Sequence, residues 1–304
     1  MVFTKKQKIA ALSVISNTTL IILKTVVGIL SGSVSIISEA IHSSMDLVAA
    51  IIAYISVSIS EKPADERHPY GHGKIENISG VIEGLLIFLA AGLIIMAAVK
   101  KLFHPMPIEE TLIGAAVMLF SAAVNTIVAH FLYKTAREED SVALEADALH
   151  LKTDVYTSLG IAAGLLAIKV TGLYILDPLI AICVAMLIIK EAWYLCSVAF
   201  SPLLDARLNS EEEQPLKDVL EHLTKEKNFE IKYLKTRKSG SLKFADFHLL
   251  LTPETTIREG NIIAQTIRDE LQRISPSFHV HINLEMRGSV IPSSNENIQN
   301  TEDV

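Results

Sequence analysis

Long apolar segments are the feature that most limits what this chain can fold into. Six windows before Phe200 are long enough to cross the hydrocarbon core of a bilayer, which takes about 20 helical residues. They are Ile9–Leu30, Val34–Ser60, Ile78–Lys100, Glu110–Tyr133, Asp147–Val170 and Tyr174–Phe200. Half of the 304 residues are hydrophobic, which is too apolar for an ordinary soluble domain. The sequence therefore predicts an α-helical membrane protein with six transmembrane helices.

Turns and basic residues predict the topology. Ser31-Gly32-Ser33 and Thr171-Gly172 are typical of tight turns, so the flanking windows should form helical hairpins. Basic residues in short segments gather on the side of the N-terminus (Lys5, Lys6, Lys8, Lys62, Arg67, Lys74, Lys134, Arg137) rather than on the other side (Lys100, Lys101, Lys169). The positive-inside rule then places both termini in the cytoplasm. We expect a multi-pass protein of the cell (inner) membrane.

Charge and cysteine content argue against several other classes of protein. The net charge is −7 and no basic stripe is present, so nucleic acid is not expected as a partner. Cys183 and Cys196 both fall in the last apolar window, 13 residues apart. Neither a disulfide framework nor a thiolate metal site is expected from this spacing.

The segment after the last window reads as a small cytoplasmic domain. Two amphipathic helices are predicted at Glu211–Glu226 and Thr256–Arg273, and three strands at Glu230–Lys238, Leu242–Leu251 and Phe278–Met286. The order αββαβ predicts an open, ferredoxin-like α+β sheet with helices on one face. We assign residues 1–204 to the membrane domain and 205–288 to this domain. Residues 289–304, rich in Ser, Asn and Glu, are predicted to be a disordered tail.

Two pairs of ionisable residues interrupt the apolar windows. His42 and Asp46 are four residues apart in the second window, and His150 and Asp154 are four apart in the fifth. Residues at this spacing share one helix face, so two facing helices would offer two imidazoles and two carboxylates. This is a complete set of nitrogen and oxygen ligands for a tetrahedral Zn²⁺. The alternative is that each pair only forms an interhelical hydrogen bond; the duplication favours the metal site.

Electrostatics indicates what such a site would exchange. Two carboxylates and one divalent cation sum to zero charge, which a medium of low dielectric constant tolerates. The empty site would need protons or water in place of the cation, and metal binding would displace protons chiefly from the histidines. The pattern therefore predicts exchange of a divalent metal for protons.

Other polar residues in the windows are predicted to have packing or pairing roles. These are Asn17, Lys24, Glu39, Glu83 and Asn125. Asp147 stands where the fifth window begins, so its carboxylate is expected to be stabilised by the helix dipole.

A histidine-rich loop, "DERHPYGHGK", joins the second and third windows. Asp65, His68 and His72 have the spacing of metal ligands, and the Pro and Gly residues shape the turn. Solvated histidines are common in loops, but beside a membrane metal site this motif is predicted to be a second metal site.

These motifs resemble the cation diffusion facilitators, a family that exports divalent metals. The resemblance covers about residues 9–288 and includes "HPYGHGK" and "LEADALHLKTD". It implies a homodimer that alternates between inward- and outward-facing states and uses the proton gradient. It also implies that His42, Asp46, His150 and Asp154 carry the metal, that Asp65, His68 and His72 bind metal in the loop, and that Lys74 and Asp205 form a charge lock.

The sequence departs from the family pattern at His42, where many bacterial members have Asp. The His form resembles zinc-preferring eukaryotic transporters, and two neutral nitrogen donors favour Zn²⁺ over harder ions. We expect Zn²⁺ as substrate and possible regulator. The alternative main substrates are Fe²⁺, Cd²⁺, Co²⁺ and Mn²⁺.

The second departure concerns the cytoplasmic domain. Zinc-exporting relatives carry several histidines there, but the matching positions here are Lys232, His248, Asn261, Asn283 and Glu285. A different, weaker site is predicted, built from a subset of Asp246, His248, His279, His281 and Glu285. The alternative is that this domain serves mainly as a dimer contact.

Two other functions fit the sequence less well than a secondary transporter. A membrane metallohydrolase would need an open zinc position for water, whereas four protein ligands fill a tetrahedral ion. A passive channel would need several weak sites along a pore. One strong site near the middle of the membrane favours alternating access.

Overall fold

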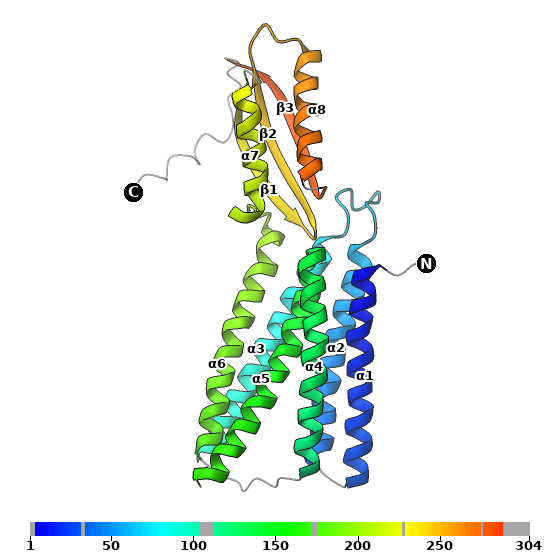
Figure 1. The fold of residues 1–304 in the computed structure, drawn as a ribbon, viewed down its shortest axis with the longest axis vertical. Coiled ribbons are helices and arrows are strands. Elements are labelled where there is room, and N and C mark those ends of the chain that lie inside the picture. Colours follow the sequence, from blue (N-terminus) through cyan, green and yellow to red (C-terminus); the bar gives the residue numbers. More distant parts are fainter. Residues whose placement is uncertain are drawn as a thin grey trace. The chain divides into compact units, whose positions relative to one another are not determined.

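The computed structural model describes residues 4–31, 34–103, 112–171, 175–226, 229–274 and 276–287 (Figure 1). The chain divides into two compact units. One holds Met1–Ala206 with Ser239–Ser241, and the other holds Arg207–Lys238 with Leu242–Val304. The predicted tail, residues 289–304, lies outside the described residues.

Six long helices make up the first unit. They are α1 (Lys5–Ser31), α2 (Val34–Ser60), α3 (Lys74–Phe103), α4 (Leu112–Glu139), α5 (Val142–Thr171) and α6 (Leu176–Phe200), followed by the 3-10 turn η1 (Ser201–Leu204). Several helices continue past the predicted apolar windows into charged sequence. The windows mark only the part of each helix that is apolar, whereas backbone hydrogen bonding continues beyond it.

The first unit has the surface of a membrane protein. Many large apolar side chains point outward, including Leu30, Leu89 and Leu187, which are 82%, 59% and 59% exposed. Among the described residues, Lys5–Val27, Lys74–Lys100 and Pro178–Leu204 are each long and apolar enough to cross a bilayer. The count of six transmembrane spans stays a prediction.

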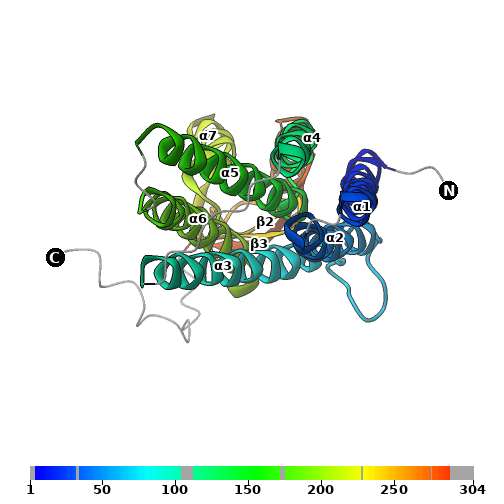
Figure 2. The ribbon, with the colours of Figure 1, turned by 90° about the horizontal axis from the view of Figure 1, so that it is seen from below.

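Helix α5 lies between α4 and α6 (Figure 2). On one side, Leu144, Ala148 and Leu151 join a buried apolar cluster with residues of α1, α2 and α4. On another side, Ala146 joins a cluster formed with α3 and α6. Two apolar contacts therefore fix how α5 is rotated about its axis, and with it the direction of its polar residues.

Helices α3 and α6 pack closely where Gly84 faces Cys196. A Cβ atom added to Gly84 would lie 2.4 Å from the Cys196 sulfur. No side chain fits at that distance, so the absence of a Cβ at Gly84 is what permits this approach.

A buried polar network joins four segments at one end of the helical unit. The Glu76 carboxylate on α3 accepts hydrogen bonds from Lys6 Nζ at 3.2 Å, from Ser60 Oγ at 2.7 Å and from Ser141 Oγ. Glu76 is 1% exposed and Lys6 is 7% exposed. These bonds link α1, α2, α3 and the start of α5. They also compensate the buried Glu76 carboxylate, which would be costly without partners.

The second unit is a small α+β domain, as predicted. It contains α7 (Ser210–Glu226), β1 (Glu230–Ser239), β2 (Leu242–Leu251), α8 (Ile257–Ile274) and β3 (Phe278–Met286). The sheet order is β1-β2-β3, and β2 pairs with β3 in parallel. The predicted order αββαβ is confirmed, with element ends within one or two residues.

Alternation along the strands produces a two-faced sheet. Ala245, Phe247 and Leu249 of β2 pack with apolar residues of α7 and α8 in one buried cluster. The residues between them point to the opposite face, since successive side chains of a strand alternate. Both helices therefore cover one face, and Asp246 and His248 belong to the other.

Replacing Glu76 by alanine is predicted to destabilise the helical unit by about 3–5 kcal/mol, because it leaves the Lys6 ammonium buried without its anion. Thermal unfolding of the purified full-length chain in detergent would measure this. The matched control is Glu138→Ala, which removes the exposed partner of Lys5. The role given to Glu76 is wrong if both variants unfold at the same temperature as the wild type.

Candidate metal centre

Asp46, His150 and Asp154 gather inside the helical unit. Asp46 lies on α2, and His150 and Asp154 lie one turn apart on α5. One ligand atom from each residue lies within 4.8 Å of the others. The Nε2 atom of His150 is 3.3 Å from Oδ1 of Asp46. Asp46 is 5% exposed and His150 is 9% exposed, whereas Asp154 is partly exposed.

The spacing of these atoms suits a small divalent cation. Two ligand atoms at about 2.0–2.1 Å from a tetrahedral zinc are about 3.3–3.4 Å apart, which matches the separation between His150 and Asp46. The Nδ1 atom of His150 is buried and has no hydrogen-bond partner among the described residues. The cluster thus supplies one imidazole and two carboxylates to the same point.

His42 belongs to α2, one helical turn before Asp46. Its side chain lies outside the described part of the chain, and so does that of Glu39. The neighbouring Ser43 is buried and accepts a hydrogen bond from Lys24 Nζ of α1 at 2.6 Å. The position of the fourth predicted ligand, His42, is therefore known only from its place on α2.

Two further carboxylates are buried near this cluster. Glu83 on α3 and Asp147 on α5 are both 0% exposed, and both act electrostatically on His150. Ser79 donates a hydrogen bond to Glu83 at 3.1 Å, and the Ser13 hydroxyl lies beside Asp147 outside hydrogen-bonding geometry.

The prediction that Asp147 sits at a helix N-terminus is wrong. Because α5 begins at Val142, Asp147 lies on its inward polar stripe with His150 and Asp154.

The loop between α2 and α3 forms a second cluster. One ligand atom from each of Asp65, His68 and His72 lies within 4.8 Å of the others. Asp65 Oδ1 is 3.1 Å from His68 Nδ1, and Asp65 Oδ2 is 3.5 Å from His72 Nε2. Gly71, at φ +80°, makes the turn that brings the two rings to 4.3 Å. The predicted residues do converge.

Backbone donors keep the loop carboxylate in its charged form. The N–H groups of His68 and Arg67 donate to Asp65 Oδ1 at 2.6 Å and 2.9 Å. The first of these bonds is the main cause that lowers the pKa of Asp65 below its ordinary value. Asp65 therefore remains an anion, ready to bind a cation, over the whole physiological pH range.

Lys74 and Asp205 form an ion pair, with Nζ 2.8 Å from Oδ1. Their side chains are 34% and 53% exposed, so solvent screens the attraction. Asp205 ends η1 in the left-handed backbone conformation, with φ 54°. Asp tolerates that conformation better than most residues.

The predicted cytoplasmic site is only partly assembled. His248 Nδ1 lies 2.7 Å from Glu285 Oε1, and the Asn283 amide lies 3.4 Å from His248 Nε2. The Tyr233 ring meets the His248 ring edge-on at 5.3 Å. This side of the sheet brings together one predicted pair of ligands.

The remaining predicted residues of that site lie further along the strands. The β2–β3 register pairs Asp246 with His281. His279 instead stacks on Phe244, with ring centroids 5.4 Å apart. Within the described residues, no group of three ligand atoms gathers on this sheet face.

Long apolar helices that enclose a cluster of ionisable side chains are typical of membrane proteins that handle ions or protons. Residues 10–204 match the family model for the cation efflux transmembrane domain, and residues 208–287 match that for the cation efflux protein cytoplasmic domain. The chain belongs to the cation efflux family, the cation diffusion facilitators. It is an integral membrane protein and a cation efflux transporter, as its motifs predicted.

Proteins similar to this chain include an uncharacterised transporter, a magnetosome protein and a cation-efflux pump. An uncharacterised transporter of Synechocystis is 34% identical, over 82% of this chain and 80% of its own length. The magnetosome protein MamB of Paramagnetospirillum magneticum is 31% identical, over 83% and 84%. The cation-efflux pump FieF of Shewanella oneidensis is 31% identical, over 84% and 85%.

The Lys74–Asp205 pair is predicted to add no more than about 1 kcal/mol to stability, since both side chains reach solvent. Asp205→Asn removes the charge and tolerates the left-handed backbone, and Lys74→Met removes the partner. Each variant should lower the unfolding temperature equally, and the double variant should lower it no further. High salt should abolish the differences. Additive losses in the double variant would contradict a direct pair.

Proposed function

We propose that this protein exports Zn²⁺ in exchange for protons through the cluster of Asp46, His150 and Asp154, completed by His42. The observation that carries the proposal is that two carboxylates and an imidazole gather at ligand spacing inside a membrane domain, with Asp46 and His150 buried and Asp154 partly exposed. Ionisable groups in membrane segments are costly and are retained where they serve ions or protons.

Charge balance gives the site its preference for a divalent cation. Two carboxylates neutralise one such ion, and the filled site then carries no net charge in a medium of low dielectric constant. Without the cation, either protons must neutralise the carboxylates or water must solvate them. Metal and protons therefore compete for the same atoms, which is the basis of exchange.

The donor set supports zinc as the main substrate. Two neutral imidazoles, from His42 and His150, favour borderline-soft metals over Mn²⁺, which prefers oxygen ligands. Cd²⁺, Co²⁺ and Fe²⁺ are the alternative substrates that share this preference. Protons bind the same imidazole nitrogens as the metal, so a more acidic outer side promotes release.

The loop cluster is proposed to hold metal on the cytoplasmic side, where Asp65, His68 and His72 would meet ions before they reach the buried site. This placement follows from the basic residues near the loop, which predict cytoplasmic termini in the cell's inner membrane. During alternating access, an ion would bind first at the loop cluster and then at the buried site.

The two domains are proposed to divide the work. Residues 1–204 carry the metal, and residues 205–288 hold two copies of the chain together as a homodimer. The pair of His248 and Glu285 on the open sheet face offers a starting point for a regulatory metal site. The Lys74–Asp205 ion pair, between η1 and the start of α3, would support the dimer at the membrane surface.

Asp46→Asn and Asp154→Asn are each predicted to lower zinc flux by more than about 100-fold, since loss even of groups that support metal ligands costs about 10–100-fold. Proteoliposomes with an imposed pH gradient and a zinc-sensitive dye would measure uptake. Asp269→Asn, on the exposed face of α8, is the matched control and should transport normally. Normal flux in either site variant would show that the site is elsewhere, and flux independent of the pH gradient would indicate a channel.

His42→Asp is predicted to reduce the preference for Zn²⁺ over Mn²⁺, because it replaces a nitrogen donor by an oxygen donor. The ratio of initial uptake rates for the two metals in the same vesicles gives the measurement. An unchanged ratio would remove His42 from the site.

Asp65→Asn is predicted to raise the KM for zinc while leaving kcat nearly unchanged. The amide oxygen can still accept the backbone N–H bonds that shape the loop, but the negative charge is lost. Initial rates over a range of zinc concentrations separate the two constants. An equal fall in kcat would place Asp65 in the transport step itself.

A further inference from the structure

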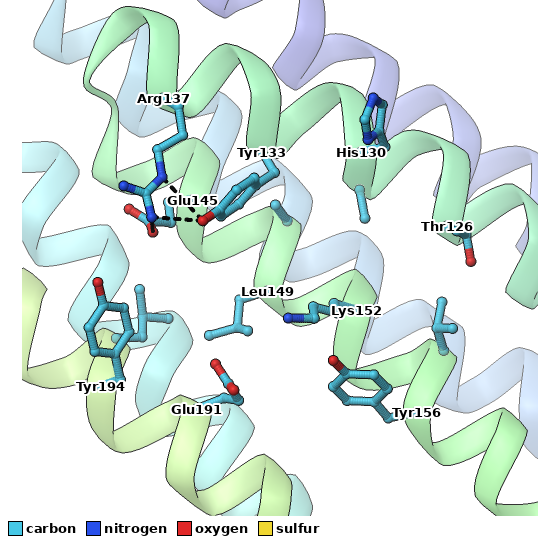
Figure 3. Close-up of a pocket in the computed structure, with 14 residues that line it drawn as sticks. Thr126, His130, Tyr133, Arg137, Glu145, Leu149, Lys152, Tyr156, Glu191 and Tyr194 are labelled. Carbon is cyan, nitrogen blue, oxygen red and sulfur yellow. Dashed lines mark hydrogen bonds and ion pairs between the residues drawn. The ribbon is translucent and has the colours of Figure 1, made fainter.

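A pocket of about 400 Å³ is lined by residues of α4, α5 and α6, and no residue of the two candidate metal clusters is among them (Figure 3). Its wall is mostly apolar, with Ala148, Leu149 and Val155 of α5 among the lining residues. Four charged side chains also reach it: Arg137, Glu145, Lys152 and Glu191. A mainly apolar cavity with a few convergent polar groups is the usual form of a ligand site.

The charged residues of this pocket lie in or beside membrane helices. Such residues usually face the bundle interior or a water-filled cavity. Lys152 is exposed, although it lies on α5 between the buried residues Leu151 and Thr153. An occupant of this pocket would therefore meet both positive and negative groups.

Three of the charges already have partners from the chain. Arg137 Nη2 donates to the Tyr133 hydroxyl at 2.7 Å and lies 3.7 Å from Glu145 (Figure 3). Lys152 Nζ lies 5.5 Å from the centre of the Tyr156 ring. Glu191 makes no hydrogen bond or ion pair with any residue that the structure describes and acts on Lys152 only through space. The Glu191 carboxylate is therefore available to accept hydrogen bonds from a cationic group of a ligand.

Aromatic residues place the pocket near the lipid headgroups. Trp193 and Tyr194 follow Glu191 on α6 and are 69% and 54% exposed, and Tyr133 on α4 is 46% exposed. Exposed Trp and Tyr mark the level where membrane meets water. Long side chains such as Lys152 reach this level from deeper positions by extending along the helix.

We propose that this pocket binds the headgroup of a zwitterionic phospholipid with a primary ammonium group, namely phosphatidylethanolamine. The ammonium group donates hydrogen bonds to Glu191, and the phosphate accepts them from Lys152, while the acyl chains lie against Leu149 and Val155. Two cations and two anions line the pocket, so its formal charge favours a zwitterion over an anionic lipid.

The tyrosine rings disfavour phosphatidylcholine. A quaternary ammonium group binds best within a cage of aromatic faces. Here the guanidinium of Arg137 lies 5.1 Å from the centre of the Tyr133 ring, and Lys152 lies over Tyr156. The chain's own cations occupy these two faces, whereas the carboxylate of Glu191 accepts hydrogen bonds, which a primary ammonium can donate and a quaternary ammonium cannot.

Lipid retention by the full-length protein tests the proposal. The protein is purified in detergent, stripped of lipid and mixed with equal amounts of dioleoyl phosphatidylethanolamine, phosphatidylcholine and phosphatidylglycerol. Native mass spectrometry then counts each bound lipid. The expected result is about tenfold enrichment of phosphatidylethanolamine, the effect of about one charge-assisted hydrogen bond. Equal retention, or enrichment of either other lipid, overturns the proposal.

Variants assign the preference to the pocket. Glu191→Gln should abolish the preference for phosphatidylethanolamine over phosphatidylcholine. Glu191→Asp, which serves as a second variant if the glutamine variant misfolds, should keep part of this preference. Lys134→Met, near the same end of α4 but outside the pocket lining, is the matched control and should behave as wild type. An unchanged preference in both Glu191 variants contradicts the proposal. The readout needs no metal or flux, so its failure is distinct from failure of the transport proposal.

Discussion

The membrane domain depends on how it compensates buried charge. An ionised side chain at the centre of a bilayer costs about 2.5–3.5 kcal/mol on insertion scales, so each one needs a partner. Glu76 finds Lys6, Ser60 and Ser141 within the chain. Asp46 and Asp154 lie at ligand distance from the His150 imidazole, where a mobile divalent cation can neutralise both carboxylates. The first arrangement holds helices together; the second suits a site that fills and empties.

Helix α5 brings these two roles together. Its apolar residues join both buried clusters of the helical unit, which leaves a third face for Asp147, His150 and Asp154. A change of metal occupancy would therefore act on a helix that contacts α1, α2, α3, α4 and α6. This gives a physical route from the state of the site to the arrangement of the bundle, which the proposed alternating access requires.

Much of this could be read from the sequence because local patterns carry it. Apolar windows predicted six helices, and alternation predicted three strands nearly to the residue. The spacing of Asp65, His68 and His72 predicted a cluster, since all three lie in one short loop. Glu83 and Asp147 were missed as neighbours of His150. Their proximity depends on how α3 and α5 pack, and no local pattern reports that. The pocket around Glu191 was missed for the same reason, because three helices contribute to it.

X-ray absorption spectroscopy of zinc-loaded protein tests the central claim most directly. With the loop histidines replaced (His68→Ala and His72→Ala), the buried site should show four nitrogen and oxygen neighbours at about 2.0–2.2 Å, two of them imidazole. Adding His150→Ala should remove bound zinc or one imidazole from this shell. Six-coordinate zinc without imidazole, or a spectrum unchanged by His150→Ala, would contradict the account.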